Sequence, residues 1–241
     1  MNSYPRGSEW RKWDLHVHST ASDGELSPKQ IIDIAEQEGL TVIAITDHHT
    51  VRNVDEAKRL GKARGITVIS GVEFRTEYGA KSVHIIGLFP DEHDGIELTQ
   101  DAIEHLGLDN LGLSRILIET EGRREKPESD NLKAFKQGMH RFQVDLKAAS
   151  DLVHKYGGLI SVHAGNKSNS IEEMKHDGIG KRNVNDVVDS LGPVKEELLK
   201  SYIDICEIGS PNDRSAEFYI NQFGIPVITA SQLNRTATNS V

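Results

Sequence analysis

The stretch that decides the fold is Trp13-Asp14-Leu15-His16-Val17-His18, in which two histidines stand two positions apart on either side of an apolar residue. Alternation with a period of two is typical of a β-strand, because side chains at positions i and i+2 of a strand lie on the same face. The sequence therefore predicts a strand over Trp13–Val17. It directs His16 and His18 into one site and Val17 into an apolar layer.

Six further strand patterns follow, and helical patterns separate most of them. The predicted strands cover residues 41–46, 66–74, 82–89, 159–162, 203–208 and 225–230, and the predicted helices cover 28–39, 54–63, 96–121, 142–156, 186–201 and 214–223. We expect a charged loop over 122–131 and a long polar loop over 164–185. Strand–helix alternation predicts an α/β protein with parallel strands and crossover helices. About seven strands in a chain of this length favour a closed or nearly closed barrel. A doubly wound open sheet is the alternative, although no glycine-rich phosphate-binding signature follows the first strand.

The composition narrows the class of protein. The 241 residues include 37 acidic and 28 basic side chains, a net charge of −9, which disfavours non-specific binding to nucleic-acid phosphates. The sequence has no apolar run of about 20 residues, so we expect no transmembrane helix and no membrane partner. The first residues lack the apolar run of a signal peptide. The single cysteine, Cys206, has no partner for an internal disulfide, so we expect a cytoplasmic protein.

Residue types that commonly bind metals occur on or just after five of the predicted strands. The carboxyl ends of parallel strands open on one face of a barrel, where active sites lie. Imidazoles combined with carboxylates suit Zn²⁺, Mn²⁺ or Fe²⁺, and this set is large enough for two or three ions with Glu73 as a bridge. The candidates are His16, His18, Asp23, Asp47, His48, Glu73, His84 and His163.

These segments resemble the PHP (polymerase and histidinol phosphatase) domain family. The resemblance covers Trp13 to about Ala230. It implies a distorted (β/α)7 TIM-like barrel with two or three metal ions at the carboxyl ends of its strands. It also implies a phosphoesterase acting on phosphomonoesters, nucleotides or nucleic-acid ends. The matching motifs are His16-Val17-His18-Ser19 with Asp23-Gly24, Ile45-Thr46-Asp47-His48, Gly71-Val72-Glu73 and His84-Ile85-Ile86-Gly87.

The resemblance also implies roles for individual residues. The implied metal ligands are His16, His18, Asp23, His48, Glu73, His84 and His163. We expect one ion at His16, His18 and Glu73, a second between Glu73, His84 and His163, and a third favoured by Asp23 and His48. Glu73, His48 and Asp23 are the predicted catalytic residues. Arg75, Lys167 and Arg182 are the predicted phosphate-binding residues, because guanidinium and ammonium groups bind phosphate oxygens.

The two ends of the chain differ from the core of the pattern. The family has Asp-x-His after its last strand, whereas this chain has Gln232-Leu233-Asn234. That motif usually supplies one ligand to each of two ions. Its absence predicts a truncated chain, a frameshifted end or a naturally degenerate copy, with incomplete metal occupancy. Cys206 or Glu207 are candidates to replace the missing ligands. We expect an N-terminal extension over 1–12, a barrel domain over 13–231 and an unrelated polar tail over 232–241. The segment before the first strand is similar to the PHP segment that heads AAA-like ATPases of the TrlF type, which implies a fused or associated ATPase as a partner.

Three functions fit these patterns. The first is a metal-dependent phosphoesterase. The second is a non-catalytic metal-bound module that regulates or scaffolds a partner, suggested by the missing motif. The third is an amidohydrolase-type barrel, which also begins with His-x-His but usually has a lysine on its fourth strand, where this chain carries His84 and no lysine within the apolar run.

Overall fold

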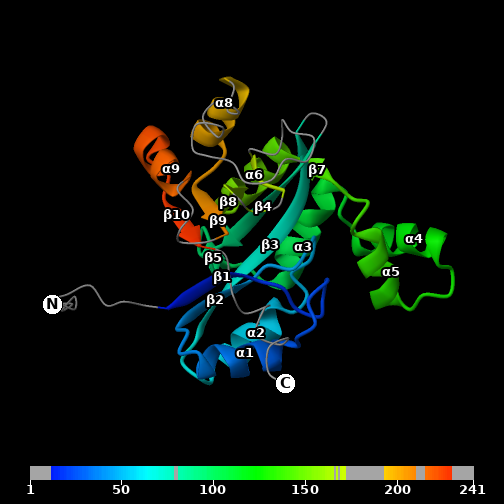
Figure 1. Ribbon diagram of the computed structural model, residues 1–241. Helices are drawn as coiled ribbons and strands as arrows, with labels where there is room; N and C mark the ends of the chain where they lie inside the picture. The colour runs from blue at the N-terminus through cyan, green and yellow to red at the C-terminus, as the bar shows by residue number, and fades with distance from the viewer. Residues whose placement is uncertain are drawn as a thin grey trace, which may run out of the picture.

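The computed structural model describes residues 12–78, 81–165, 167, 169–171, 193–209 and 215–229. Its main feature is a curved sheet with helices packed outside it (Figure 1). Seven strands follow one another in the order β1-β2-β3-β4-β8-β9-β10, and β7 pairs with the end of β3. The strands are β1 (Trp13–Val17), β2 (Val42–Ile45), β3 (Thr67–Tyr78), β4 (Lys81–Phe89), β7 (Val144–Asp145), β8 (Leu159–Ala164), β9 (Ile205–Ile208) and β10 (Val227–Thr229), with a separate pair β5 (Glu92–His93) and β6 (Ile96–Glu97).

The helices begin where the sequence supplies caps. Ser27 and Gln30 form a capping box at the start of α1, and Asp130 and Asp145 accept backbone N–H bonds at the starts of α5 and α6. None of the helices described is long and apolar enough to cross a membrane. The helices are α1 (Pro28–Gln37), α2 (Val54–Lys62), α3 (Gln100–Leu106), the 3-10 helix η1 (Leu108–Leu111), α4 (Arg115–Glu125), α5 (Asn131–Gly138), α6 (Leu146–Lys155), α8 (Pro193–Ser201) and α9 (Ser215–Phe223).

The seven predicted strands are all present, but the prediction of an all-parallel (β/α)7 barrel is wrong in one respect. β4 runs antiparallel to both of its neighbours, β3 and β8. Only two residues separate β3 from β4, so no crossover helix joins them. The sheet path ends at β1 and β10, which do not pair with each other in the part of the chain described. The observed architecture is therefore a mixed α/β fold with a curled, half-barrel sheet.

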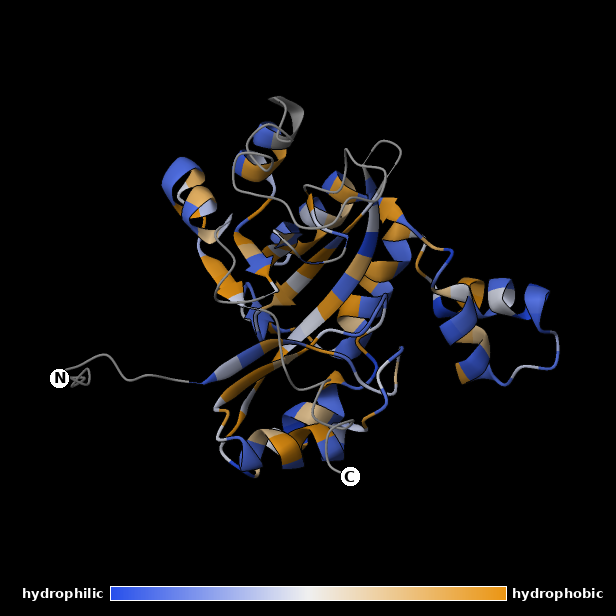
Figure 2. Cartoon of the chain, viewed as in Figure 1, coloured by the Kyte–Doolittle hydropathy of each residue, from blue (hydrophilic) through white to orange (hydrophobic). Residues whose placement is uncertain are grey.

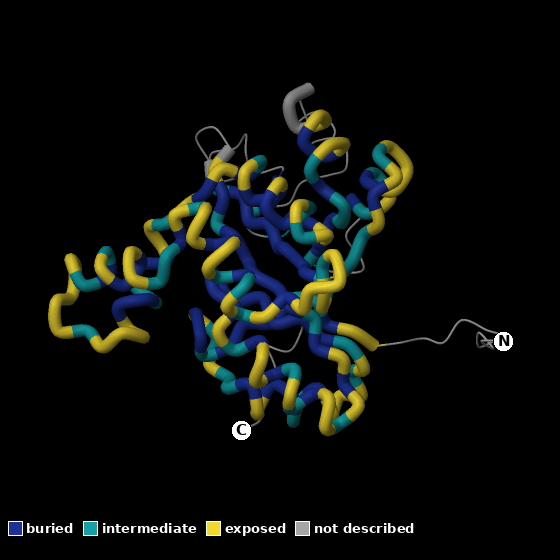
Figure 3. The backbone as a smooth tube through the Cα atoms, turned by 180° about the vertical axis from the view of Figure 1, so that it is seen from behind, coloured by how far each residue is buried: buried dark blue, intermediate teal, exposed yellow. Residues whose placement is uncertain are grey.

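The segment between β4 and β8 also differs from the prediction. The segment 96–121, expected to be mostly helical, is divided into β6, α3, η1 and the start of α4. The charged stretch 122–131, expected to be a loop, continues α4 to Glu125 and begins α5 at Asn131. Together α4 and α5 form a hairpin that projects from the body and is largely exposed (Figures 1 and 3). Its two helices approach each other closely at Gly122. A Cβ atom at this position would collide with the carbonyl of Ala134, so the close approach requires glycine.

The two faces of the sheet bury different side chains. Alternate strand residues such as Val17, Phe74, Ile85 and Cys206 join the main apolar core. A small apolar cluster of Ala44, Ile86 and Leu88 lies apart from that core. The strands appear as hydrophobic bands in Figure 2 and as the buried centre in Figure 3. Cys206 lies in the main core, on the face of β9 opposite Glu207, and belongs to none of the donor groups found among the described residues.

The predicted domain boundaries at residues 13 and 231 stay predictions. Residues 1–11 and 230–241, including Gln232-Leu233-Asn234, lie outside the described residues, as do most of the predicted polar loop 164–185 and the first part of the predicted helix 186–201.

Candidate metal centre

Strand alternation brings the predicted ligands to one place. Val17, Phe74, Ile85, Val162 and Cys206 point into the main core. Because neighbouring side chains on a strand point to opposite faces, the residues beside them point to the other face. Those residues are His16, His18, Glu73, His84, His163 and Glu207. They come from five strands of the sheet, and their ring and carboxylate contacts join them into one cluster.

Glu73 is the hub of this cluster. Its carboxylate is almost fully buried. Oε2 lies 2.8 Å from His18 Nε2, 3.2 Å from His16 Nε2 and 3.5 Å from His48 Nε2. Oε1 lies 2.8 Å from His84 Nδ1 and 3.4 Å from His163 Nε2. The two oxygens thus face different imidazoles, as a bridging carboxylate does. Glu73 stands in the middle of the long strand β3 rather than at a strand end, where the sequence placed it.

Backbone pairing fixes His48 beside Glu73. His48 and Glu73 form a parallel β-bridge just beyond β2. The amide of Glu73 donates to the carbonyl of Asp47 at 3.1 Å, and the amide of His49 donates to the carbonyl of Glu73 at 3.1 Å. His48 is therefore held at the level of Glu73, with its ring 4.8 Å from that of His18.

The turn after β1 adds Asp23. Its Oδ1 lies 2.8 Å from His18 Nδ1 and its Oδ2 lies 3.5 Å from His48 Nε2. The side chain of Asp23 is 42% exposed, so it forms the open side of an otherwise buried cluster. Asp47 has a different role. It accepts bonds from the Ser19 backbone and the Ser22 hydroxyl and so holds this turn in place.

The donors of the cluster fit divalent metal ions. Among the residues that the structure describes, four groups of three bring their ligand atoms within 4.8 Å of one another: His16–His18–Glu73, His16–His163–Glu207, His18–Asp23–His48 and His48–Glu73–His84. His16 Nε2 and His18 Nε2 face each other at 2.9 Å. Two nitrogen lone pairs repel each other at this distance unless a proton or a cation lies between them. Nε2 of His84 and Nδ1 of His48 are buried without a hydrogen-bond partner. A buried polar atom without a partner is unfavourable, and metal coordination would satisfy it.

The charges of the metal-free cluster are unevenly divided. Burial on its own lowers the pKa of His18, but hydrogen bonds to Asp23 and Glu73 outweigh it and raise that pKa to about 10. Burial, reinforced by Lys167, lowers the pKa of His163 to about 3. Burial on its own raises the pKa of Glu73, but the neighbouring His48 and His16 hold it well below its usual range. The cluster is therefore an anionic hub surrounded by protonated and neutral imidazoles.

Glu207 also belongs to the cluster. The sequence indicated it only as a candidate to replace the ligands of the absent Asp-x-His motif. Its carboxylate is fully buried on β9, with Oε1 2.9 Å and Oε2 3.1 Å from His16 Nδ1. Lys167, which follows β8, contacts Glu207 Oε1 and places Nζ 2.9 Å from His16 Nδ1. The signal in the sequence is the same alternation that sends Cys206 into the core. Of the other predicted phosphate-binding residues, Arg75 reaches the cluster, and Arg182 lies outside the described residues.

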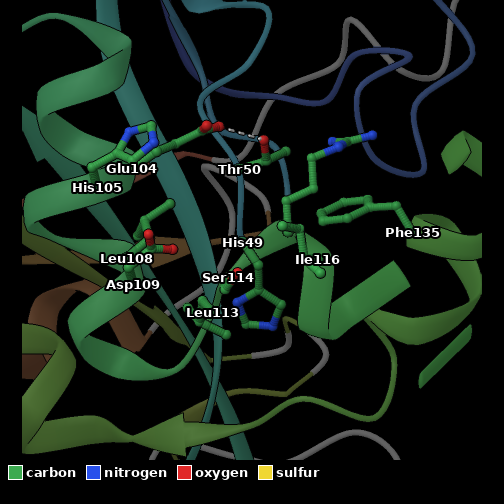
Figure 4. Close-up of a pocket in the computed structure, with 11 residues that line it drawn as sticks. His49, Thr50, Glu104, His105, Leu108, Asp109, Leu113, Ser114, Ile116 and Phe135 are labelled. Carbon is green, nitrogen blue, oxygen red and sulfur yellow. Dashed lines mark hydrogen bonds between the residues drawn. The ribbon is translucent and has the colours of Figure 1, made fainter. Parts of the chain in front are cut away.

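His49 points away from the cluster, although it directly follows His48. Its backbone has a positive φ of 55°. Its Nε2 donates to the carbonyl of Phe142 at 3.1 Å, and burial lowers its pKa to about 3. It lines a separate cavity of about 190 Å³ beside α3 and the start of α4, where Thr50 donates to Glu104 (Figure 4).

Comparison with known proteins supports this reading of the cluster. A 5'-3' exoribonuclease from Haemophilus influenzae is 46% identical over 78 residues, which is 32% of this chain and 28% of that protein. A 3',5'-nucleoside bisphosphate phosphatase from Chromobacterium violaceum is 41% identical over 75 residues, 31% of this chain and 26% of that protein. The chain thus spans under a third of the length of either relative.

Solved structures with the same fold match nearly the whole chain. A putative metal-dependent phosphoesterase from Bifidobacterium adolescentis has a TM-score of 0.61 and 15% identity, covering 96% of this chain and 90% of the other. An amidohydrolase from Chromobacterium violaceum with bound sulfate has a TM-score of 0.61 and 19% identity, covering 91% and 86%. At such identities these two likenesses establish the fold alone. The PHP domain itself matches residues 14–179, which include all seven predicted ligands and make up well over half of the chain, and the protein therefore belongs to the PHP domain family.

Proposed function

We propose that this chain hydrolyses phosphate esters with two or three divalent ions, Zn²⁺, Mn²⁺ or Fe²⁺, bound around Glu73. The observation that carries the proposal is the buried Glu73 carboxylate, whose two oxygens face two different sets of imidazoles. Such ions lower the pKa of a bound water from 15.7 to about 7 and neutralise the phosphate oxygens.

Each ion would have its own ligands in the cluster. His16, His18 and Glu73 would hold one ion, and Glu73, His84 and His163 a second. Asp23 and His48 would favour a third, at the exposed side of the cluster where a substrate arrives. Glu73, His48 and Asp23 are therefore the residues that we assign to catalysis.

Arg75 is the cation that we assign to the substrate phosphate. It lies two residues beyond Glu73 on β3 and opposite His84 on β4, so the three side chains share one face. Its Nη2 lies 3.3 Å from His48 Nε2, and its Nε is buried without a hydrogen-bond partner. A guanidinium placed in this way can donate to phosphate oxygens in a fixed geometry.

The surroundings of the cluster favour a substrate larger than phosphate. A hollow of about 590 Å³ lies between the turn at Thr20 and Ala21, Arg52 and the start of α5 at Asn131. Thr20 and Ala21 lie in the chain between His18 and Asp23, so the hollow and the cluster share this turn. Its lining combines apolar surface with the guanidinium of Arg52, which suits a nucleotide or a nucleic-acid end, the classes named for the two relatives.

A second candidate, a metal-bound module without turnover, is favoured by one observation. The sequence lacks the Asp-x-His of the family's last motif at Gln232-Leu233-Asn234. Association with an ATPase stays a prediction from the sequence.

A reconstitution assay separates the two candidates. Protein stripped with a chelator is mixed with Mn²⁺ or Zn²⁺ and assayed on p-nitrophenyl phosphate, a nucleoside bisphosphate and a 5'-phosphorylated oligonucleotide. We expect metal to restore hydrolysis of at least one substrate. The His16→Ala/His18→Ala double variant should abolish it, whereas His105→Ala, at an exposed position on α3, should not change it. Tight metal binding with no turnover on any substrate would favour the second candidate.

A further inference from the structure

One donor group of the cluster already contains a cation from the chain itself. His16, His163 and Glu207 bring their ligand atoms within 4.8 Å of one another. Among these donors lies the ammonium of Lys167, which contacts Glu207 Oε1 and lies 2.9 Å from His16 Nδ1. Lys167 is only 14% exposed and Glu207 is fully buried, so this ion pair is shielded from water.

The backbone holds Lys167 at this position. The amide of Lys167 donates to the carbonyl of Ala164, the last residue of β8, at 3.4 Å. Two residues further on, the carbonyl of Asn169 accepts a bond from the amide of His84 at 3.0 Å. Backbone hydrogen bonds thus hold Lys167 itself and Asn169, and the side chain of Lys167 lies across the cluster rather than toward solvent.

Charge explains why the ammonium and a divalent ion would compete. Glu207 is the one carboxylate of this donor group, and Lys167 already balances it. A divalent ion beside the ammonium would meet a like charge at contact distance with no unpaired carboxylate to offset it. The group around Glu73 differs, because its carboxylate is surrounded by imidazoles that can lose their protons.

His16 links the two groups. Its Nε2 faces His18 and Glu73, and its Nδ1 faces Glu207. A carboxylate on the second nitrogen of a metal-binding histidine fixes the ring and its tautomer. With Lys167 bound to Glu207, His16 is presented through Nε2 to the ion at Glu73.

We propose that Lys167 is the resident cation of the His16–His163–Glu207 group and excludes a metal ion from it. This inference rests on the proposed function, since it concerns how many ions the same centre holds. It assigns Lys167 to the metal centre rather than to the substrate phosphate. Because the proposed second ion already uses His163 Nε2, removal of the ammonium frees Glu207 and His16 Nδ1 for one additional divalent ion.

The test counts ions and does not use activity. Chelator-treated protein is titrated with Mn²⁺, and free Mn²⁺ is measured from its electron paramagnetic resonance signal. Lys167→Met should bind one more ion per chain than the wild type, at least about tenfold more tightly than any further wild-type site, because a like charge at contact is removed. Lys167→Arg keeps the charge and should match the wild type. Lys200→Met removes a lysine–glutamate pair of 2.6 Å on the surface and is the matched control.

Two further variants keep the test decisive. Lys167→Gln is neutral but still donates a hydrogen bond to Glu207, and it serves if the methionine variant does not fold. Adding Glu207→Gln to Lys167→Met should remove the extra ion. An unchanged ion count in folded Lys167→Met and Lys167→Gln would overturn the inference and leave the proposed function intact. Absence of Mn²⁺ and Zn²⁺ binding by the wild type would overturn the proposed function and the inference with it.

Discussion

Replacing Glu73 with glutamine is the sharpest test of the metal centre. The substitution keeps the size of the side chain and removes one negative charge that two ion positions share. Glutamine also replaces one acceptor oxygen with an NH₂ group, which cannot coordinate a cation. Both ions should therefore weaken together, because Oε1 and Oε2 serve opposite sides of the cluster.

The expected size of the effect follows from the geometry. A unit charge about 4 Å from another, at an effective dielectric constant of about 20, contributes about 4 kcal/mol. Since about 1.4 kcal/mol corresponds to a factor of ten, each ion should bind about 10³-fold more weakly in Glu73→Gln. This figure is a lower bound for a divalent ion, whose charge is doubled.

The assay is a competition between the protein and a chelator of known affinity, followed by hydrolysis of the best substrate at saturating Mn²⁺. Glu77→Gln is the matched control, because Glu77 lies on the same strand but is exposed and four residues further on. It should leave both ions unchanged. Two ions that bind Glu73→Gln within about tenfold of the wild-type affinity would refute the bridging role and, with it, the basis of the proposed mechanism.

Three further predictions concern binding, pH and packing. Arg75→Met should raise the inhibition constant of inorganic phosphate by about 10- to 100-fold, which corresponds to the loss of one charged hydrogen bond. Arg75→Lys should recover part of this loss. An unchanged constant would show that Arg75 does not bind the phosphate. The raised pKa of His18 stabilises the metal-free fold fully below about pH 6.5, and this stability is lost as the pH rises toward about 10. Denaturation in the presence of chelator should show this fall in the wild type and a shallower one in His18→Asn, and equal slopes would contradict it. Gly122→Ala should lower the free energy of unfolding by about 1–3 kcal/mol through collision with the Ala134 carbonyl, whereas Gly209→Ala, with open space around it, should not; urea titration compares them.

The sequence predicted the cluster because its ligands follow a local rule. His16 and His18 flank Val17, and His84 and His163 also neighbour residues of the main core, so period-two alternation assigns each to the opposite face. The same rule separates Glu207 from Cys206. The position of Glu73 within its strand was predicted less well, because strand length depends on pairing with distant residues. β3 extends to Tyr78 because β4 returns antiparallel along it and β7 pairs with its end.

The direction of β4 could not be predicted from its local sequence. A buried strand that is apolar over several residues has the same pattern in parallel and antiparallel sheets. The hairpin α4–α5 shows a second limit. Its sequence is charged and includes Pro127, which disfavours a core element. Both helices form nevertheless, because Ile118 and Phe135 become buried in the main apolar core. Tertiary packing overrides local composition in such segments.

The contact between Lys167 and Glu207 had no local signature, because 40 positions separate the two residues in sequence.

The imidazole pKa values suggest why this cluster would be both stable and ready for metal. A histidine with a pKa of about 10 and another with a pKa of about 3 belong to one connected group of rings. Protons at His18 therefore offset the charge of Glu73 when no metal is bound, and metal binding must release them. Affinity for metal should rise with pH over the range in which the metal-free fold loses the contribution of His18. Around the Glu73 carboxylate, metal ions would thus take the place of the imidazole protons. The fold would depend on the presence of either the protons or the ions.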